Sequence, residues 1–290
     1  MADAAGWERA RTFPQYLLPQ HLLSAGMYRL ARCRWRPVKE FFISSFIRHY
    51  LVDMSLARVT DYHAYTSFNE FFTRALKPEA RPIASGAELV ICPIDGAISQ
   101  IGTINDTAIF QAKGHNYHLA DLVAGDEQLT ARFRDGKFIT LYLSPRDYHR
   151  IHMPVAGQLT RMHYVPGRLF SVNRATTRSV PGLFARNERV ISVFQTAAGL
   201  LAVIMVGAIF VGSMETVWAG QITPAPVRER RQWDYLVPGR EVRLDRGVEL
   251  GRFNMGSTVI LLFEPGKIEW QDRLQADTAV VMGQAIGKTK

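Results

Sequence analysis

The 290-residue sequence is poor in cysteine and has no internal repeat or low-complexity tract. Its two cysteines, Cys33 and Cys92, are far apart and follow no framework spacing. This excludes a disulfide-stabilised scaffold and a cysteine-based metal site, and it favours a reducing compartment. Apolar residues make up 47% of the chain, so we expect a folded globular protein with disorder confined to its ends.

The sequence also lacks an apolar leader and a clear membrane span. Asp3, Glu8, Arg9 and Arg11 interrupt the first residues, so a cleaved secretory signal is not expected. The 18-residue uncharged stretch 197–214 meets the lower limit for a membrane helix. It is rich in valine and isoleucine and interrupted by glycine, which favours buried strands with a tight bend.

Acidic residues are outnumbered, 26 against 35 Lys and Arg, giving a formal charge of +9. Residues 1–51 hold eight of the basic residues against three acids. A nucleic acid, an anionic membrane or an acidic ligand would each suit such a charge. No recognisable nucleic-acid-binding module occurs, so nucleic acid is not an expected partner.

The basic N-terminal region has the apolar spacing of helices. Val38, Phe42, Phe46 and Tyr50 recur at intervals of four, the period of one helix face. Basic amphipathic helices with bulky aromatic residues suit the surface of an anionic bilayer. The alternative is that these faces pack on the protein core, as they do in most surface helices.

The remainder of the sequence indicates an α+β fold, with N-terminal amphipathic helices followed by a β-rich catalytic core. Ser67 and Glu70 have capping-box spacing and predict a helix from Phe68 to Leu76. Short apolar runs bounded by Gly, Pro and Asp then predict strands, for example at 88–92, 138–143 and 189–194. We expect a helical membrane-association region over 1–65 and a catalytic domain over 66–290.

Four places in the β-rich part carry residues suited to chemistry: Asp95, the pair His149 and His152, Glu215, and Gly256-Ser257-Thr258. Each has an ordinary alternative, since Asp-Gly is common in turns and Gly-Ser-Thr in loops. The histidine pair has no third ligand at suitable spacing, so no metal site is expected. Ser, His and Asp together permit a nucleophile, a base and an orienting carboxylate, an arrangement recognised by geometry.

The combination of segments is more specific than any one of them. Residues 253–263, followed by Glu264-Pro-Gly-Lys267, resemble the self-processing segment of phosphatidylserine decarboxylases, with Met255 replacing the usual leucine. Other segments resemble the same family, in order, from about residue 65 to 285: 111–117, 144–154, 164–167, 183–189 and 215–220. The likeness is to the bacterial single-domain form.

The resemblance implies that Ser257 attacks the Gly256 carbonyl and that the resulting ester is lost by β-elimination. His152 would be the base that activates the hydroxyl, with Asp95 fixing its tautomer and stabilising the imidazolium. Cleavage between Gly256 and Ser257 would give a β chain, 1–256, and an α chain, 257–290, whose new N-terminus is a pyruvoyl group. We expect the apolar run 259–263 to be a central strand that keeps the α chain in the core.

The resemblance also implies the reaction. The covalent pyruvoyl cofactor, formed from Ser257, would make a Schiff base with the amine of phosphatidylserine, and loss of CO2 would yield phosphatidylethanolamine. His149 is the candidate proton donor. The enzyme would be peripheral on the cytoplasmic face of the cell membrane, bound to anionic phospholipid, as a heterodimer of its cleaved α and β chains that dimerises further. Residues 111–117 and 164–170 would line the substrate site or serve as turn and packing elements.

Two alternatives remain open at this point. One is a soluble pyruvoyl-dependent decarboxylase acting on a free amino acid, against which the amphipathic N-terminus argues. The other is a non-catalytic membrane-binding protein with an intact chain. Whether the chain is cut separates the second alternative from the decarboxylases.

Overall fold

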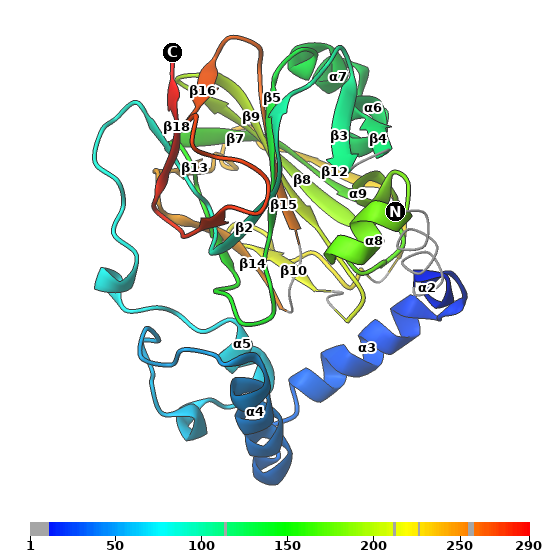
Figure 1. Ribbon diagram of the computed structural model, residues 1–290, viewed down its shortest axis with the longest axis vertical. Helices are drawn as coiled ribbons and strands as arrows, with labels where there is room; N and C mark the ends of the chain where they lie inside the picture. Colours follow the sequence, from blue (N-terminus) through cyan, green and yellow to red (C-terminus); the bar gives the residue numbers. More distant parts are fainter. Residues whose placement is uncertain (1–11, 113–114, 211–212, 226, 255–257) are drawn as a thin grey trace.

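The computed structural model describes residues 12–112, 115–210, 213–225, 227–254 and 258–290. Its N-terminal helices lie beneath a β-rich body in the view of Figure 1, in agreement with the predicted α+β class. The helices of the described residues are α2 Pro14–Leu17, α3 Gln20–Ala31, α4 Arg36–Tyr50, α5 Phe68–Phe72, α6 Leu119–Leu122, α7 Glu127–Phe133, α8 Arg174–Ser179 and α9 Leu183–Arg186, with 3-10 turns η1 Tyr62–Ala64 and η2 Pro78–Ala80.

The capping box predicted at Ser67 is present at the start of α5. The Ser67 hydroxyl accepts a hydrogen bond from the Glu70 backbone N–H at 3.2 Å, which satisfies a helix donor that has no partner within the helix. The helix ends at Phe72, earlier than the predicted Leu76. Leu76 instead forms an antiparallel bridge with Ala57, so tertiary pairing overrides the local helical pattern.

The strands form four antiparallel sheets. They are β1 Leu89–Ile91, β2 Gly96–Thr103, β3 Ala108–Ala112, β4 His115–His118, β5 Lys137–Tyr142, β6 Arg150–His152, β7 Gly157–Val165, β8 Arg189–Thr196, β9 Gly199–Val206, β10 Met214–Thr216, β11 Gly220–Gln221, β12 Arg231–Asp234, β13 Arg243–Leu244, β14 Glu249–Phe253, β15 Thr258–Phe263, β16 Ile268–Trp270, β17 Ala279–Val280 and β18 Ala285–Thr289. The largest sheet has the strand order β12-β7-β8-β9-β15-β5-β2-β17, and β13 also pairs with β7.

The smaller sheets complete the body. One has the order β1-β18-β16, another is the β3-β4 pair, and the third runs β11-β10-β14-β6. This last sheet carries His152 on β6, next to β14. Residues 255–257 connect β14 to β15, so the chain passes from the sheet that holds His152 into the largest sheet across the predicted cleavage bond.

The run 259–263 is a central strand, as predicted. β15 pairs with β9 on one side and β5 on the other, and each of its residues is buried. A strand buried on both faces needs a continuous apolar sequence. The α-chain segment is therefore part of the main core.

The described part of the uncharged stretch, 197–210 and 213–214, is strand, turn and short loop without a helix, in agreement with the prediction of buried strands. β8 and β9 form a hairpin, and Gly199 takes a φ of 85° at the turn, a conformation favourable to glycine. β9 is buried between β8 and β15. Within the residues that the structure describes, no helix is long and apolar enough to cross a membrane.

The aromatic stripe predicted on α4 faces the protein. Phe42 and Phe46 pack against a second apolar cluster, formed by Ala31, Ile43, Val52, Tyr65, Phe68, Phe71 and Phe72. The packing alternative therefore holds for this face. The opposite side of α4 exposes Phe41, at 65% of its surface.

Candidate active site

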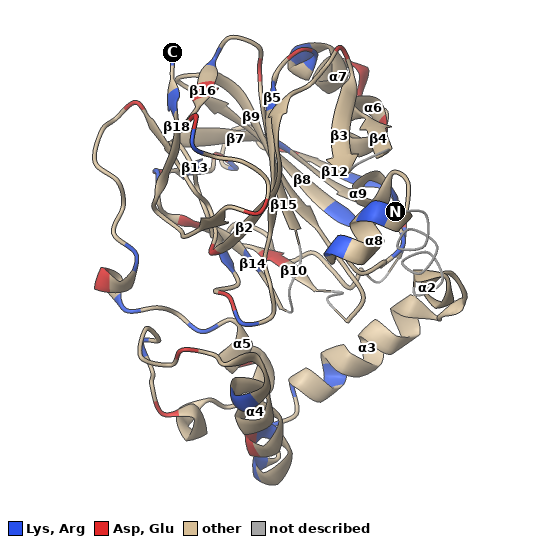
Figure 2. Ribbon diagram, viewed as in Figure 1, with Lys and Arg blue, Asp and Glu red and all other residues tan. Residues whose placement is uncertain are grey.

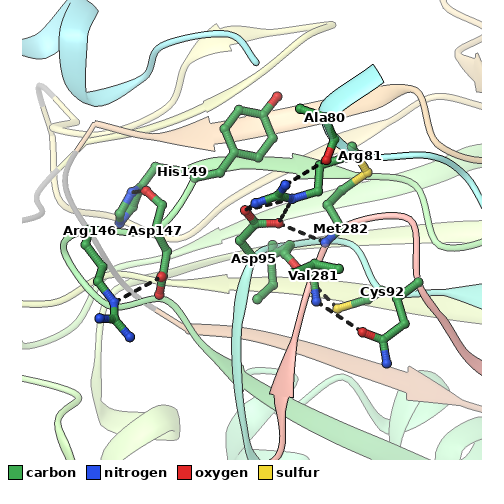
Figure 3. Close-up of polar contacts among 12 residues, drawn as sticks. Ala80, Arg81, Cys92, Asp95, Arg146, Asp147, His149, Val281 and Met282 are labelled. Carbon is green, nitrogen blue, oxygen red and sulfur yellow. Dashed lines mark hydrogen bonds and ion pairs between the residues drawn. The ribbon is translucent and has the colours of Figure 1, made fainter. Parts of the chain in front are cut away.

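Asp95 lies in a charged, buried setting just before β2. Its carboxylate accepts hydrogen bonds from Arg81 Nε at 2.8 and 3.0 Å, from Arg81 Nη2 at 2.5 Å and from the Met282 backbone N–H at 2.9 Å. Figure 3 shows the Asp95 carboxylate between Arg81 and Met282. Among the described residues, Asp95 is therefore held by a bidentate ion pair and a backbone amide.

His152 is held by other groups. Its Nδ1 lies 2.8 Å from the Gly247 carbonyl oxygen and its Nε2 lies 3.0 Å from the Tyr148 hydroxyl. Burial lowers the pKa of His152, while the charge of Asp95 acts weakly in the opposite direction. Asp95 is near enough to influence His152 through its field, but both ring nitrogens have their contacts elsewhere in the described part of the chain.

His149 is completely buried directly before β6. Its Nδ1 lies 2.8 Å from the Asp147 carbonyl oxygen, and its ring lies 4.0 Å from that of Phe72, centroid to centroid. Burial lowers the pKa of His149 to about 3, so the ring is neutral. The Nε2 atom is buried and has no hydrogen-bond partner among the described residues.

A cavity of about 260 Å³ opens beside Asp95. Its lining is rich in charged groups, contributed by Asp53, Arg74, Arg81, Asp95, Arg146 and Asp147, with Tyr148 and three leucines. Asp147 and His149 lie to one side of Asp95 in Figure 3. Burial raises the pKa of Asp147, and the nearby charge of Asp95 acts in the same direction.

A second cavity, of about 190 Å³, is mostly apolar. Its lining comes from α4, α5, the end of β5, the loops that follow β5 and β9, and the segment before α8: Phe46, Tyr50, Phe72, Tyr142, Leu143, Pro145, Ser171, Val172, Asn173, Ala208, Ile209 and Phe210. Tyr142 pairs with Thr258, the first residue of β15. The cavity therefore adjoins the start of the strand that follows residue 257, and Phe72 links it to His149.

Gly256 and Ser257 lie outside the described residues, but both flanks of their segment are fixed. The Asn254 side-chain amide donates to Ser213 Oγ and to Glu215 Oε1, each at 2.7 Å, and Asn69 donates to its oxygen at 3.0 Å. Thr258 is held in β15 between Tyr142 and Val206. The predicted cleavage bond is thus bracketed by two anchored, buried residues.

The flanks also fit a pyruvoyl group at position 257. Thr258 Oγ1, in the residue that follows position 257, is a buried polar atom without a hydrogen-bond partner in the described structure. Such atoms are costly unless something satisfies them, and a carbonyl-rich group at residue 257 matches the donor capacity of a threonine hydroxyl. No group of three or more His, Cys, Asp or Glu side chains suited to a metal ion occurs among the described residues.

Three other segments named from the sequence contain a side chain that is bonded within the protein. The Gln111 amide donates to the Thr177 and Val180 carbonyls, and the Tyr164 hydroxyl donates to Glu188. Glu215 accepts from Asn254 and lies 3.7 Å from Arg32, the residue directly after α3. These contacts support the packing interpretation of 111–117 and 164–170, and they give Glu215 the role of an anchor.

Sequence reasoning missed Arg81, Tyr148 and Asn254. Tyr148 stands four residues before His152 inside a segment that had been singled out, and Asn254 stands three residues before Ser257. Proximity in sequence was the available signal for both. Arg81 is 14 residues from Asp95 in a proline-flanked linker, and nothing in that linker indicates its partner.

Comparison with known proteins assigns these segments to one family. A family model described as phosphatidylserine decarboxylase matches residues 68–288, and a model described as PSD matches residues 10–51. The phosphatidylserine decarboxylase proenzyme of Methylococcus capsulatus is 52% identical over 95% of both chains. Those of Pseudomonas aeruginosa and Bordetella pertussis are each 54% identical, over 95% and 94% of this chain and 96% and 92% of theirs.

Proposed function

This chain belongs to the phosphatidylserine decarboxylase family, and from that premise we propose how its residues divide the work of a self-processing, pyruvoyl-dependent carboxy-lyase. The enzyme removes CO2 from phosphatidylserine and is made as a proenzyme. What remains to be assigned is which side chain performs each step. The pairing of β6 with β14 carries the assignment, because it fixes His152 on the strand next to the one that leads into residues 255–257.

In self-cleavage, Ser257 is the nucleophile, the Gly256 carbonyl is its target and His152 is the base. A serine hydroxyl is a weak nucleophile until a neighbouring base takes its proton. His152 suits that task because burial lowers its pKa and keeps the ring neutral, ready to accept a proton. The anchored residues Asn254 and Thr258 hold the segment from both ends.

Asp95 acts on His152 through its charge. The Gly247 carbonyl already accepts from Nδ1 and fixes the tautomer, a task that the sequence had given to Asp95. When His152 becomes an imidazolium, the Asp95 carboxylate stabilises that charge, since it favours the protonated ring. The Arg81 ion pair holds the carboxylate in place for this purpose.

In decarboxylation, the pyruvoyl group at position 257 supplies the electron sink. His149 moves the proton. With Nδ1–H donating to the Asp147 carbonyl, Nε2 carries a lone pair. We assign to the His149 ring the transfer of a solvent proton, through Nε2, to the carbon that has lost CO2. Because burial lowers its pKa to about 3, the ring gives up that proton readily once it is protonated.

The apolar cavity holds the part of the lipid that lies next to the headgroup. The apolar cavity beside Tyr142 and Phe72 accepts the glycerol end and the first part of the acyl chains. It adjoins Thr258, so a headgroup entering from this side reaches position 257. The remainder of the acyl chains stays in the bilayer, because exposing them to water would cost about 0.8 kcal/mol per CH2.

The polarity of α3 is inverted for a helix that covers a protein core. Its inward side is polar: Gln20, His21, Ser24 and Tyr28 contact Leu169, Gly167, Phe210 and Gln221 respectively. Arg32, directly after the helix, lies 3.7 Å from Glu215. The outward side of α3 exposes Leu22 at 72%, and Leu17 in α2 is exposed at 75%. Nine of the nineteen exposed large apolar residues in the described structure lie between residues 13 and 51.

This surface supports docking on an anionic bilayer. α3 carries Arg29 and α4 carries Arg36 and Arg48, all exposed, and Figure 2 marks the basic residues of these helices in blue. Apolar groups that enter the headgroup boundary and cations that contact anionic lipid together give peripheral binding. We place the enzyme on the cytoplasmic face of the cell membrane, as an αβ heterodimer that dimerises further.

The test of self-cleavage is the mass of the polypeptides. The wild-type chain should give two fragments that divide at Gly256–Ser257, and the smaller should resist Edman degradation. Ser257→Ala should remain one chain, whereas the control Ser85→Ala, in the linker before β1, should be cut. An uncut, active wild-type chain contradicts the mechanism.

The test of docking is co-sedimentation with anionic phospholipid vesicles. Leu17→Ser with Leu22→Ser should reduce binding and turnover on vesicles, while self-cleavage continues. The matched control, Leu236→Ser with Val237→Ser, changes two exposed apolar residues of the body, at 62% and 40%. Equal binding by both double variants would refute docking through this surface.

A further inference from the structure

The contacts of His152 determine which of its nitrogens is the base. A carbonyl oxygen only accepts hydrogen bonds, so the contact with Gly247 places the ring proton on Nδ1. In the neutral ring, Nε2 then carries the lone pair. The atom facing that lone pair at 3.0 Å is the Tyr148 hydroxyl.

Tyr148 is the donor in this contact. It is buried, with 6% of its surface exposed, and burial raises its pKa to about 12, so the phenol keeps its proton. Its ring lies 5.6 Å from that of His152, at 31° to it, and the side chain also lines the cavity beside Asp95. The basic lone pair of His152 therefore already accepts a hydrogen bond.

A proton that reaches Nε2 must either pass through this hydroxyl or displace it. We propose that Tyr148 relays the proton of Ser257 to His152 during self-cleavage. The proposal rests on the role of His152 as the base. As Ser257 Oγ bonds to the Gly256 carbonyl carbon, its O–H bond breaks, the Tyr148 oxygen takes that proton, and the original phenolic proton bonds to His152 Nε2.

The return path uses the same atoms. When the bond between the Gly256 carbonyl carbon and the Ser257 nitrogen breaks, its electron pair goes to nitrogen. Nε2 then gives its proton to the Tyr148 oxygen, which passes its own to that nitrogen. Tyr148 ends as it began, a neutral phenol, and His152 is again a neutral base.

The charges around the pair come from four groups. Glu249 on β14 and Asp95 before β2 favour the protonated ring, whereas Arg150 on β6 opposes it. Tyr148 is influenced by the same three groups and by Arg252 on β14. Because the phenol carries the proton, the buried His152 ring does not have to contact Ser257 directly as it gains and loses charge.

The decisive variant is Tyr148→Phe, which keeps the ring and removes the hydroxyl. Full-length chain made by cell-free synthesis is chased in buffers from mildly acidic to mildly alkaline, and cleavage is followed on denaturing gels. With the relay lost, the rate at the alkaline plateau should fall at least about tenfold. The pH midpoint should also move upward, because loss of a hydrogen bond to the neutral ring raises the pKa of His152.

The control is Tyr65→Phe, which removes a similarly buried hydroxyl that donates to the Val59 carbonyl. It should cleave at the wild-type rate. A ring-fluorinated tyrosine at position 148 serves if the phenylalanine variant does not fold. It retains the hydroxyl and is a stronger donor, so it should cleave with its pH midpoint moved downward.

Two results overturn the relay. One is a Tyr148→Phe chain that cleaves as fast as the wild type or faster. That result is expected if Ser257 displaces the Tyr148 hydroxyl and gives its proton directly to His152. The other is a pH midpoint that does not move in either position-148 variant, as a purely structural role requires. His152→Gln separates the relay from the proposed base. Rapid cleavage by that chain refutes His152 as the base. If that chain stays uncut, a negative result with Tyr148→Phe counts against the relay alone.

Discussion

At the scale of single residues, His149 links catalysis to acid stability. Its pKa is about 3 in the folded protein because of burial, against 6.5 for an ordinary histidine. Between these values the unfolded chain binds the proton and the folded chain does not, so stability rises with pH there. The contribution is complete above 6.5 and is lost as the pH falls toward 3.

We therefore expect His149→Gln to flatten the acid side of the stability profile. The difference in slope should approach one proton, about 1.4 kcal/mol per pH unit. Urea unfolding over this range, on the uncleaved Ser257→Ala background, measures it as a single-chain transition. The exposed His49 provides the control as His49→Gln. Parallel profiles for His149→Gln and its parent would contradict the burial argument.

The ion pair of Arg81 and Asp95 makes a second residue-scale prediction. Both side chains are largely buried, at 16% and 9% exposure. Arg81→Met leaves a buried carboxylate with only the Met282 amide, so it should destabilise the protein by about 3–5 kcal/mol. Arg81→Met with Asp95→Leu removes both charges and should cost less than the single change. Thermal unfolding of uncleaved chains tests the order, and an equal or larger loss in the double variant contradicts it.

The sequence offered candidate site residues but not their partners. The structure places Asp95, His149 and His152 in one region of the molecule. Their contacts do not follow from spacing, because Gly247 is 95 residues from His152 and Arg81 approaches Asp95 from the helical linker. Such contacts depend on how strands and loops meet in three dimensions, which periodicity does not encode.

At the scale of elements, Asn254 fixes the end of β14 that leads into the cleavage segment. Its side chain joins α5, through Asn69, to Ser213 and Glu215. Asn254→Ala should leave buried polar groups unsatisfied, cost about 1–3 kcal/mol and slow self-cleavage. The cleavage rate relative to Asn105→Ala, in the turn before β3, measures the effect. Unchanged cleavage with reduced stability would limit Asn254 to a structural role.

Elements with continuous patterns were predicted best. The run 259–263 in β15 and most of β9, within the stretch 197–214, are buried because both faces of these strands meet protein. The N-terminal helices show the limit. Periodicity detected the face of α4 with Phe42 and Phe46, which packs inward, whereas the outward face of α3 became evident only from its polar contacts with the body.

At the scale of the whole molecule, the cleavage that we propose at Gly256–Ser257 divides one core between two polypeptides. β15 lies between β9 and β5, β17 pairs with β2, and β18 pairs with β1. The α chain therefore contributes strands to two sheets whose other strands belong to the β chain. The sheets, and not the peptide bond at Gly256, hold the two chains together.

We expect the cleaved chains to remain associated until the protein unfolds. The five apolar side chains of 259–263 are fully buried, and their burial alone stabilises the association by roughly 8–15 kcal/mol. Size-exclusion chromatography should recover both chains in one peak in buffer and separate them only in denaturant. Leu261→Ser, at the centre of β15, should release the small chain at lower denaturant than the exposed control Val281→Ser. Dissociation of the wild-type chains in plain buffer would contradict the central position of β15.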